Sequence, residues 1–166
     1  MATVPIKQIG LQREAWGPRF WTILHILAEC SGKQTTLIQS NDEADAWIGL
    51  IRALPGALPC ALCRQHFREW LVQRRMDHLR TITHEGRQVF LRDWVWGCHD
   101  RVNQMTQKVS PSVETCTELY PKRSIEKEVQ ELAGMFRLAL DQRQLKPEDV
   151  TRWKQMLARL RVIYGI

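Results

Sequence analysis

The 166-residue sequence contains no apolar run long enough to cross a membrane, so we expect no membrane-spanning segment. Its first ten residues lack the apolar stretch of a secretory signal and the Arg- and Ser-rich character of a transit peptide. The five cysteines are an odd number, which excludes a fully paired secreted disulfide framework. At least one thiol is therefore expected to be free, reactive or intermolecular.

Strand patterns, internal repeats and low-complexity runs are also missing, so the chain is predicted to be all-α. The expected helices cover 14–30, 40–54, 60–75, 88–108, a short segment at 112–120, and two tail segments that begin at Ser124 and Pro147. Ser40 and Glu43 are predicted to form a capping box, and Pro55-Gly56 is predicted to end that helix. The segments 31–41 and 76–87 are polar and are predicted to be loops.

Charge is modest, with a net value of +6 from cations that are spread along the chain. This distribution is typical of a solvated surface, and it also suits a phosphate-bearing ligand or an acidic partner. No motif that reads nucleic acid is present, so we expect no nucleic-acid binding. Seven tryptophans accompany only two tyrosines, and their large flat rings suit either tight helix packing or the enclosure of an aromatic cofactor.

The most informative motif is a pair of cysteines, Cys60 and Cys63, at the predicted start of a helix. The unpaired N–H groups and the helix dipole favour a thiolate there, so a redox-active dithiol is one interpretation. The same spacing suits zinc, with His66 as a third ligand. A third interpretation is that both thiols are inert core side chains. The motif by itself does not separate the redox interpretation from the zinc interpretation.

Two further groups of polar residues lie on helix faces beside apolar stripes. Gly17, Trp21 and His25 recur at intervals of four, which could form a flat-walled niche or simply hold a half-buried histidine. His99 and Asn103 are also four apart, and they could bind a planar heterocycle or a ribose, or form the polar edge of an amphipathic helix.

Three motifs in order resemble the Erv/ALR family of FAD-linked sulfhydryl oxidases. They are Trp16-Gly17-Pro18-Arg19-Phe20-Trp21 with Leu24-His25, then Leu58-Pro59-Cys60-Ala61-Leu62-Cys63, then Trp94 with His99-Asp100-Arg101-Val102-Asn103 and Lys108. The resemblance spans roughly residues 14–120. It implies a four-helix bundle with a short fifth helix, to which this chain adds a C-terminal helical hairpin. The implied domains are 1–122 for the bundle and 123–166 for the extension, packed on the core or in a dimer interface.

The resemblance also implies an FAD site and a reaction. The implied cofactor-binding residues are Gly17, Trp21, His25, Cys63, His66, His99, Asp100, Val102, Asn103 and Lys108. Cys60 would face the substrate and Cys63 the flavin. Electrons from protein dithiols would pass through this pair to FAD and then to O₂, giving hydrogen peroxide. The Asp100 position is usually Asn in the family, so this chain would bring a carboxylate near the cofactor.

Partners and location follow from the same resemblance. The tail has no second cysteine pair, so a separate thioredoxin-like or paired-cysteine protein is expected to deliver the electrons. A homodimer is expected, and so is a viral protein in the host cytoplasm, at virus assembly sites or in the virion. Cys98 and Cys116 are candidates for a structural disulfide, although Cys98 is two residues from the usual position.

Two alternatives to the oxidase interpretation stay open at this point. One is a structural zinc module with Cys60, Cys63, His66 and either Cys98 or Cys116 as ligands. The other is a helical interaction protein that has lost catalysis and binds partners through its tail.

Overall fold

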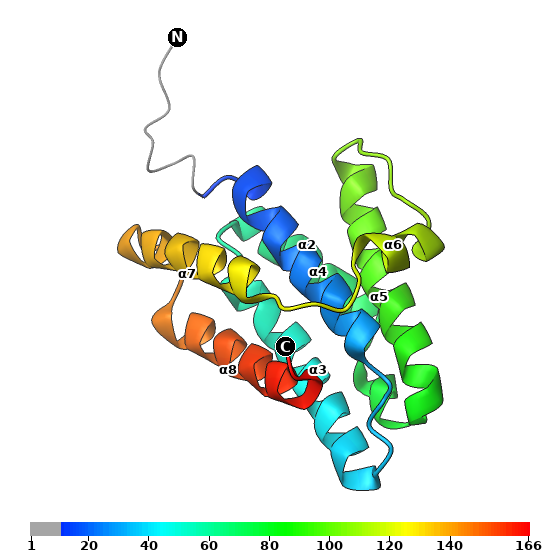
Figure 1. The fold of residues 1–166 in the computed structure, drawn as a ribbon. Coiled ribbons are helices and arrows are strands. Elements are labelled where there is room, and N and C mark those ends of the chain that lie inside the picture. Colours follow the sequence, from blue (N-terminus) through cyan, green and yellow to red (C-terminus); the bar gives the residue numbers. More distant parts are fainter. Residues whose placement is uncertain (1–10) are drawn as a thin grey trace.

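The computed structural model describes residues 11–166, and over this range the chain forms seven α-helices, one short 3₁₀ helix and no strand (Figure 1). The α-helices are α2 (Arg13–Cys30), α3 (Leu37–Ala57), α4 (Ala61–Gln73), α5 (His84–Met105), α6 (Val113–Leu119), α7 (Glu126–Asp141) and α8 (Pro147–Tyr164). The 3₁₀ helix η1 covers Asp77–Arg80. The all-α prediction is confirmed, and no helix among these residues is both long and apolar enough to span a bilayer.

The helices α2 to α5 form the bundle, and the short helix α6 lies against α5 (Figure 1). Helix α2 packs on α5 along one side and on α7 along the other, while α3 contacts both α4 and α8. The predicted fifth helix at 112–120 is confirmed as α6, with the Ser112 hydroxyl accepting a hydrogen bond from Thr115 N at 3.1 Å.

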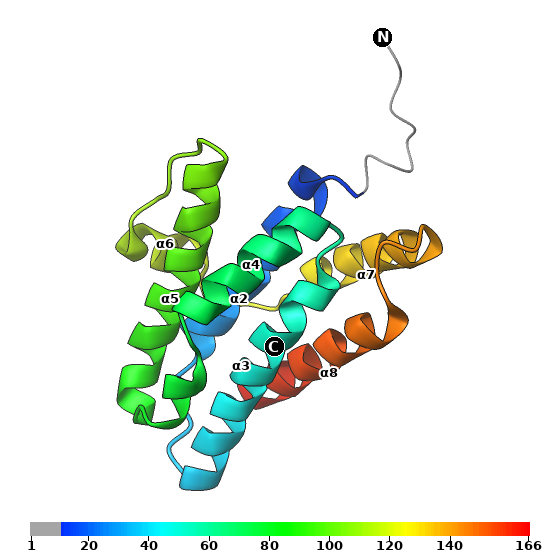
Figure 2. The ribbon, with the colours of Figure 1, turned by 180° about the vertical axis from the view of Figure 1, so that it is seen from behind.

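The C-terminal hairpin of α7 and α8 covers the outer faces of α2 and α3, as the views from both sides show (Figures 1 and 2). Three aromatic rings form the centre of this contact: Phe20 of α2 lies 5.1 Å from Trp153 and 6.1 Å from Phe136, between ring centroids. Edge-to-face pairs of this kind stabilise a core beyond the area they bury. The apolar face of the hairpin is therefore covered by the bundle of the same chain.

A buried polar cluster joins α3, α5 and α8. The Arg87 guanidinium and the Glu43 carboxylate are both almost completely inaccessible and pair at 3.1 Å. The Tyr164 hydroxyl donates to Glu43 at 2.6 Å and accepts from Trp47 Nε1 at 2.7 Å. Because every buried charge here has a partner, the last turn of the chain is fixed to the middle of the bundle.

The predicted capping box of α3 is wrong. The helix begins three residues earlier, at Leu37, where the Thr36 hydroxyl accepts from Gln39 N at 3.3 Å. Ser40 instead accepts a hydrogen bond from Arg87, and Glu43 is the buried partner of Arg87. A long-range ion pair therefore takes the place of the local cap that the sequence pattern predicts.

Two other predicted boundaries also differ from the structure. Helix α3 continues through Pro55 to Ala57, because a proline in the last turn removes only one intrahelical hydrogen bond. Helix α5 begins at His84 inside the predicted loop 76–87, and this start brings Arg87 onto the helix face that meets Glu43. The loop also contains η1, so less of it is irregular than predicted.

Candidate active site

The two cysteines of the pair are joined in a disulfide at the start of α4. Their Cα atoms are 5.2 Å apart. Cys60 is the N-cap residue, with extended backbone, and its Sγ accepts a hydrogen bond from Cys63 N at 3.1 Å. Cys60 N in turn donates to Leu58 O at 2.8 Å. The predicted placement of the pair in the first turn of a helix is confirmed.

This position favours sulfur as an anion once the disulfide opens. The first N–H groups of α4 have no carbonyl partner in the preceding turn, and the N–H of Cys63 already points at the Cys60 sulfur. The positive end of the helix dipole adds to this effect. Thiolates at such a position are better leaving groups, so the disulfide is suited to thiol exchange.

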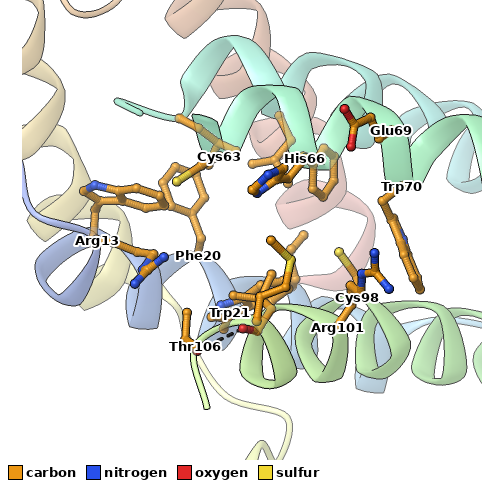
Figure 3. A pocket seen from close by; sticks show the side chains of 18 of the residues that line it. Arg13, Phe20, Trp21, Cys63, His66, Glu69, Trp70, Cys98, Arg101 and Thr106 are labelled. Atoms are coloured by element: carbon orange, nitrogen blue, oxygen red, sulfur yellow. Dashed lines mark hydrogen bonds between the residues drawn. The ribbon is translucent and has the colours of Figure 1, made fainter. Parts of the chain in front are cut away.

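Next to the disulfide lies a cavity of about 270 Å³ between α2, α4 and α5 (Figure 3). Its walls are largely aromatic and aliphatic, with the Cys63 sulfur on one side. The residues that line it are Arg13, Trp16, Gly17, Phe20, Trp21, Leu24, Leu54, Leu58, Cys63, His66, Phe67, Glu69, Trp70, Gln73, Cys98, Arg101, Val102, Met105 and Thr106. Apolar walls with a few polar groups are typical of a site for a planar organic ligand.

Charged groups gather at the cavity margin. Arg13 comes from α2, Glu69 from α4 and Arg101 from α5, and the side chains of all three are exposed at their outer ends. Opposite Cys63, the thiol of Cys98 also lies on the wall, and burial raises its pKa far above the ordinary value of 9.0. Cys98 therefore stays a neutral thiol, and the reactive sulfur of this cavity is Cys63.

Beside the cavity lies a cluster of stacked rings. His99 stacks on Trp21 with 4.2 Å between centroids, and His25 stacks on Tyr120 at 4.3 Å. The two histidines are joined by a hydrogen bond of 3.0 Å between His25 Nε2 and His99 Nδ1. Burial, with the neighbouring His99 second, lowers the pKa of His25 to about 3. Burial, followed by the charge of Lys108, lowers the pKa of His99 to about 4. Both imidazoles are neutral at pH 7.

The remaining predicted residues lie at the C-terminal end of α5 and in the segment that follows it. Asn103 is buried, and its side-chain Nδ2 donates to the Ser110 hydroxyl at 3.0 Å. The backbone carbonyl of Asn103 accepts a hydrogen bond from the backbone N–H of Lys108 at 2.8 Å. Asp100 accepts from Gln104 Nε2 at 2.8 Å. None of these three predicted residues lines the cavity, but Asp100 and Lys108 are close enough to His99 to influence its pKa.

The structure thus divides the ten predicted cofactor residues into two groups. Gly17, Trp21, Cys63, His66 and Val102 line the cavity. The other five, His25, His99, Asp100, Asn103 and Lys108, do not line it. The two histidines form the ring cluster that Trp21 joins to the cavity, and Asp100 and Lys108 lie near His99. Whether all ten bind a cofactor stays a prediction.

Several cavity residues were not among those predicted, most notably Arg13, Trp70, Arg101 and Met105. A signal for two of them is present in the sequence. Arg101 lies three positions after Cys98, and Met105 lies three positions after Val102 on the same helix. Helical spacing therefore puts Arg101 and Met105 on the helix face that carries Cys98 and Val102. Arg13 comes from the first turn of another helix, and its approach depends on tertiary packing.

The zinc alternative finds no support over residues 11–166, where no three His, Cys, Asp or Glu side chains are grouped so that they could hold a metal ion. Cys98 and Cys116 are both free, buried thiols, so the candidate bridge between them is not formed. Cys98 faces the cavity between α4 and α5, whereas Cys116 belongs to α6. The first two ligands of the zinc hypothesis are already joined in a disulfide.

Comparison with known proteins agrees with this geometry. The profile of the Erv1 / Alr family matches residues 18–124. The chain is also 24% identical over 112 residues to a protein of Invertebrate iridescent virus 3 whose name describes a FAD-linked sulfhydryl oxidase. That alignment covers 68% of this chain and 70% of the viral protein. No solved structure matches the chain significantly. Because the family profile covers more than half of the sequence and includes the disulfide, the chain belongs to the Erv1/Alr family.

Proposed function

We propose that this protein is a FAD-linked sulfhydryl oxidase that forms disulfide bonds in protein dithiols. Family membership and the name of the viral relative support this activity. The observation that carries the proposal is the redox disulfide, whose Cys63 borders an aromatic cavity while Cys60 lies at the helix start. An inert pair of core cysteines would not need such a cavity beside it.

The residues around the cavity fit FAD. Flat aromatic walls, together with Gly17 on the lining of α2, suit a planar isoalloxazine ring. Arg13 and Arg101 at the margin provide positive charge for phosphate groups. His99 stacks on the cavity residue Trp21, and together with Asn103 and Lys108 it would contact the rest of the cofactor. When bound, the cofactor supplies the two-electron redox chemistry that carries electrons to O₂ and yields hydrogen peroxide.

The chain itself performs the thiol exchange. A substrate thiolate attacks Sγ of Cys60, a substrate–Cys60 disulfide forms, and the Cys60–Cys63 bond breaks with its electron pair on Cys63. The second substrate thiolate then attacks the substrate sulfur bonded to Cys60, and Cys60 leaves as a thiolate. The substrate loses two electrons and its two protons pass to solvent, while the cysteine pair gains two electrons.

The two cysteines have different roles in this scheme because their surroundings differ. Cys60 is half-buried and is followed by the exposed residues Ala61 and Leu62, so a protein substrate can reach it. Cys63 lines the cavity, where its sulfur is next to the cofactor position. The N-terminus of α4 stabilises both thiolates.

The physiological partners are part of the same proposal. Substrates are protein dithiols, delivered by a separate thioredoxin-like or paired-cysteine protein. The likeness to a viral protein supports a viral origin, and we propose the host cytoplasm as the place of action. The hairpin covers parts of α2 and α3, so these covered faces are not available to the expected homodimer.

An anaerobic absorption spectrum tests the proposal. The purified protein is expected to show flavin absorption that bleaches when dithiothreitol is added. Cys63→Ala is expected to keep the flavin but not to bleach on the same time scale, whereas the control Cys116→Ala, which removes a buried free thiol of α6, bleaches normally. A colourless protein, or equal bleaching in Cys63→Ala, would contradict the proposal.

A further inference from the structure

The side of α4 that begins at Cys60 also carries two arginines. Cys60, Arg64 and Arg68 recur at intervals of four, so they follow one another along the same side of the helix. Arg64 is half-buried, and its Nη1 donates to Leu58 O at 2.7 Å, which fixes the guanidinium beside the disulfide. Arg68 is exposed one turn further along the helix.

The loop between α7 and α8, residues 142–146, reaches the same place. Figure 2 shows this connection at the end of the molecule where α3 passes into α4, and Arg64 Nη1 lies 3.4 Å from Gln144 O. The loop is held firmly, because Leu145 is buried in the core and Gln144 N donates to Ala139 O at 2.8 Å. It exposes two further cations, Arg143 and Lys146.

Arg64, Arg68, Arg143 and Lys146 together form what we call the basic rim. None of the four forms an ion pair with a carboxylate of residues 11–166. Most of the other arginines between residues 11 and 166 form such an ion pair. The acidic neighbours in sequence, Asp141 and Glu148, leave the rim with a net positive charge. Next to it, Leu62 is 60% exposed and offers an apolar contact.

We propose that the basic rim docks an acidic polypeptide segment that carries the substrate cysteines; this inference rests on the proposed oxidase function. Unpaired cations on two elements that meet near the Cys60 end of α4 attract carboxylates and raise the rate of productive encounter. The C-terminal hairpin thus supplies part of the substrate surface.

Two dithiol peptides of equal length test the proposal, one with glutamates around its cysteine pair and the other with lysines. At low ionic strength we expect kcat/KM for the acidic peptide to exceed that for the basic peptide by on the order of tenfold, and the ratio to fall as salt is added. Dithiothreitol, which is small and uncharged, serves as the substrate that needs no docking.

Arg143→Glu/Lys146→Glu is expected to abolish or invert the preference for the acidic peptide and to leave dithiothreitol oxidation unchanged. The matched control is Lys33→Glu/Lys127→Glu, which makes the same charge change at exposed positions. Lys33 follows the far end of α2 and Lys127 lies in the first turn of α7, so each is about one helix length from the rim. This control is expected to keep the preference.

Binding separates the docking inference from the oxidase proposal. Fluorescence anisotropy with labelled peptides in which serine replaces both cysteines measures docking without turnover. Equal affinity for the acidic and basic peptides would overturn the proposal that the basic rim docks an acidic segment, whether or not dithiothreitol is oxidised. Tighter binding of a labelled single-stranded oligonucleotide than of the acidic peptide would also overturn it. If the acidic peptide binds through the rim but dithiothreitol is not oxidised, docking stands and the oxidase proposal fails.

Discussion

Two neighbouring helices of this protein, α3 and α4, are used in opposite ways. Helix α3 has eleven buried residues and is enclosed by the bundle on one side and by α8 on the other. Helix α4 has one buried residue, Phe67, and borders a cavity of about 270 Å³. A well-packed helix next to a loosely packed one indicates that stability is concentrated around α3 and chemistry around α4.

The contrast has a physical reason. A cavity beside α4 forfeits packing contacts, so the surrounding fold must be stable without them. The C-terminal hairpin and the Glu43–Arg87–Tyr164 cluster provide this support at a distance from the disulfide. The comparison predicts that changes around α3 alter stability and that changes around α4 alter activity.

The largest stability effect is expected for Arg87→Met, which leaves the Glu43 carboxylate buried without its cation. We expect a loss of about 3–5 kcal/mol in the free energy of unfolding, measured by urea denaturation. The flavin absorption of the protein that remains folded should not change, because Arg87 does not line the cavity.

The matched control is Arg159→Met, which breaks an exposed ion pair with Asp42 at 3.1 Å. Here we expect a loss below about 1 kcal/mol. Equal losses in the two variants would mean that the buried cluster is not what holds α3, and the comparison between the two helices would fail.

A smaller effect is expected from pH and comes from the ring cluster beside the cavity. The pKa values of His25 and His99 are lowered to about 3 and about 4 in the folded protein, from 6.5. As the pH falls below 6.5, the unfolded chain therefore binds protons that the folded protein does not. Stability should be fully present above pH 6.5 and should decrease as the pH falls from 6.5 toward about 3, the pKa of folded His25. With the contribution of the half-buried His99 reduced by solvent screening, we expect a loss of about 3 kcal/mol between pH 7 and pH 5.

Urea titrations at both pH values measure this change. The double variant His25→Gln/His99→Gln should show a flatter pH dependence than the parent protein, because neither glutamine titrates. The same slope in both proteins would show that the histidines are protonated in the folded state or exposed to water.

The smallest effect is expected at Gly56, where the last turn of α3 meets the first turn of α8. A Cβ added to Gly56 would lie 2.8 Å from Asp149 Cβ, so Gly56→Ala should force the two helices apart. We expect a net loss of about 1–2 kcal/mol, since overpacking outweighs the gain in helix propensity. Gly134→Ala, on α7 with no atom within 4 Å of its added Cβ, should instead gain about 0.5–1 kcal/mol. A gain at both positions would show that the α3–α8 contact is less tight than its geometry indicates.

Local sequence patterns predicted much of the fold. The apolar spacing identified α2, α7 and α8, Ser112 identified the start of α6, and Pro59 with the following cysteines identified the start of α4. Five of the ten predicted cofactor residues share one cavity because helical spacing and the family resemblance both select one face of each helix.

The predictions that failed depend on partners far away in the sequence. Glu43 pairs with Arg87 across 44 positions rather than capping its own helix. As a result, the observed helices α3 and α5 begin earlier in the sequence than the local patterns predict. His25 meets His99 across 74 positions, which no local pattern indicates.

The sequence alone therefore determined the all-α class, the hairpin and the position of a reactive cysteine pair at a helix start, because these follow from spacing and capping within a few residues. Only the tertiary structure decided which side chains border the cavity, which histidines stack beside it and that the α7–α8 loop meets Arg64 of α4. Such arrangements depend on how helices pack against one another, and a buried charge or ring takes the partner that packing brings to it.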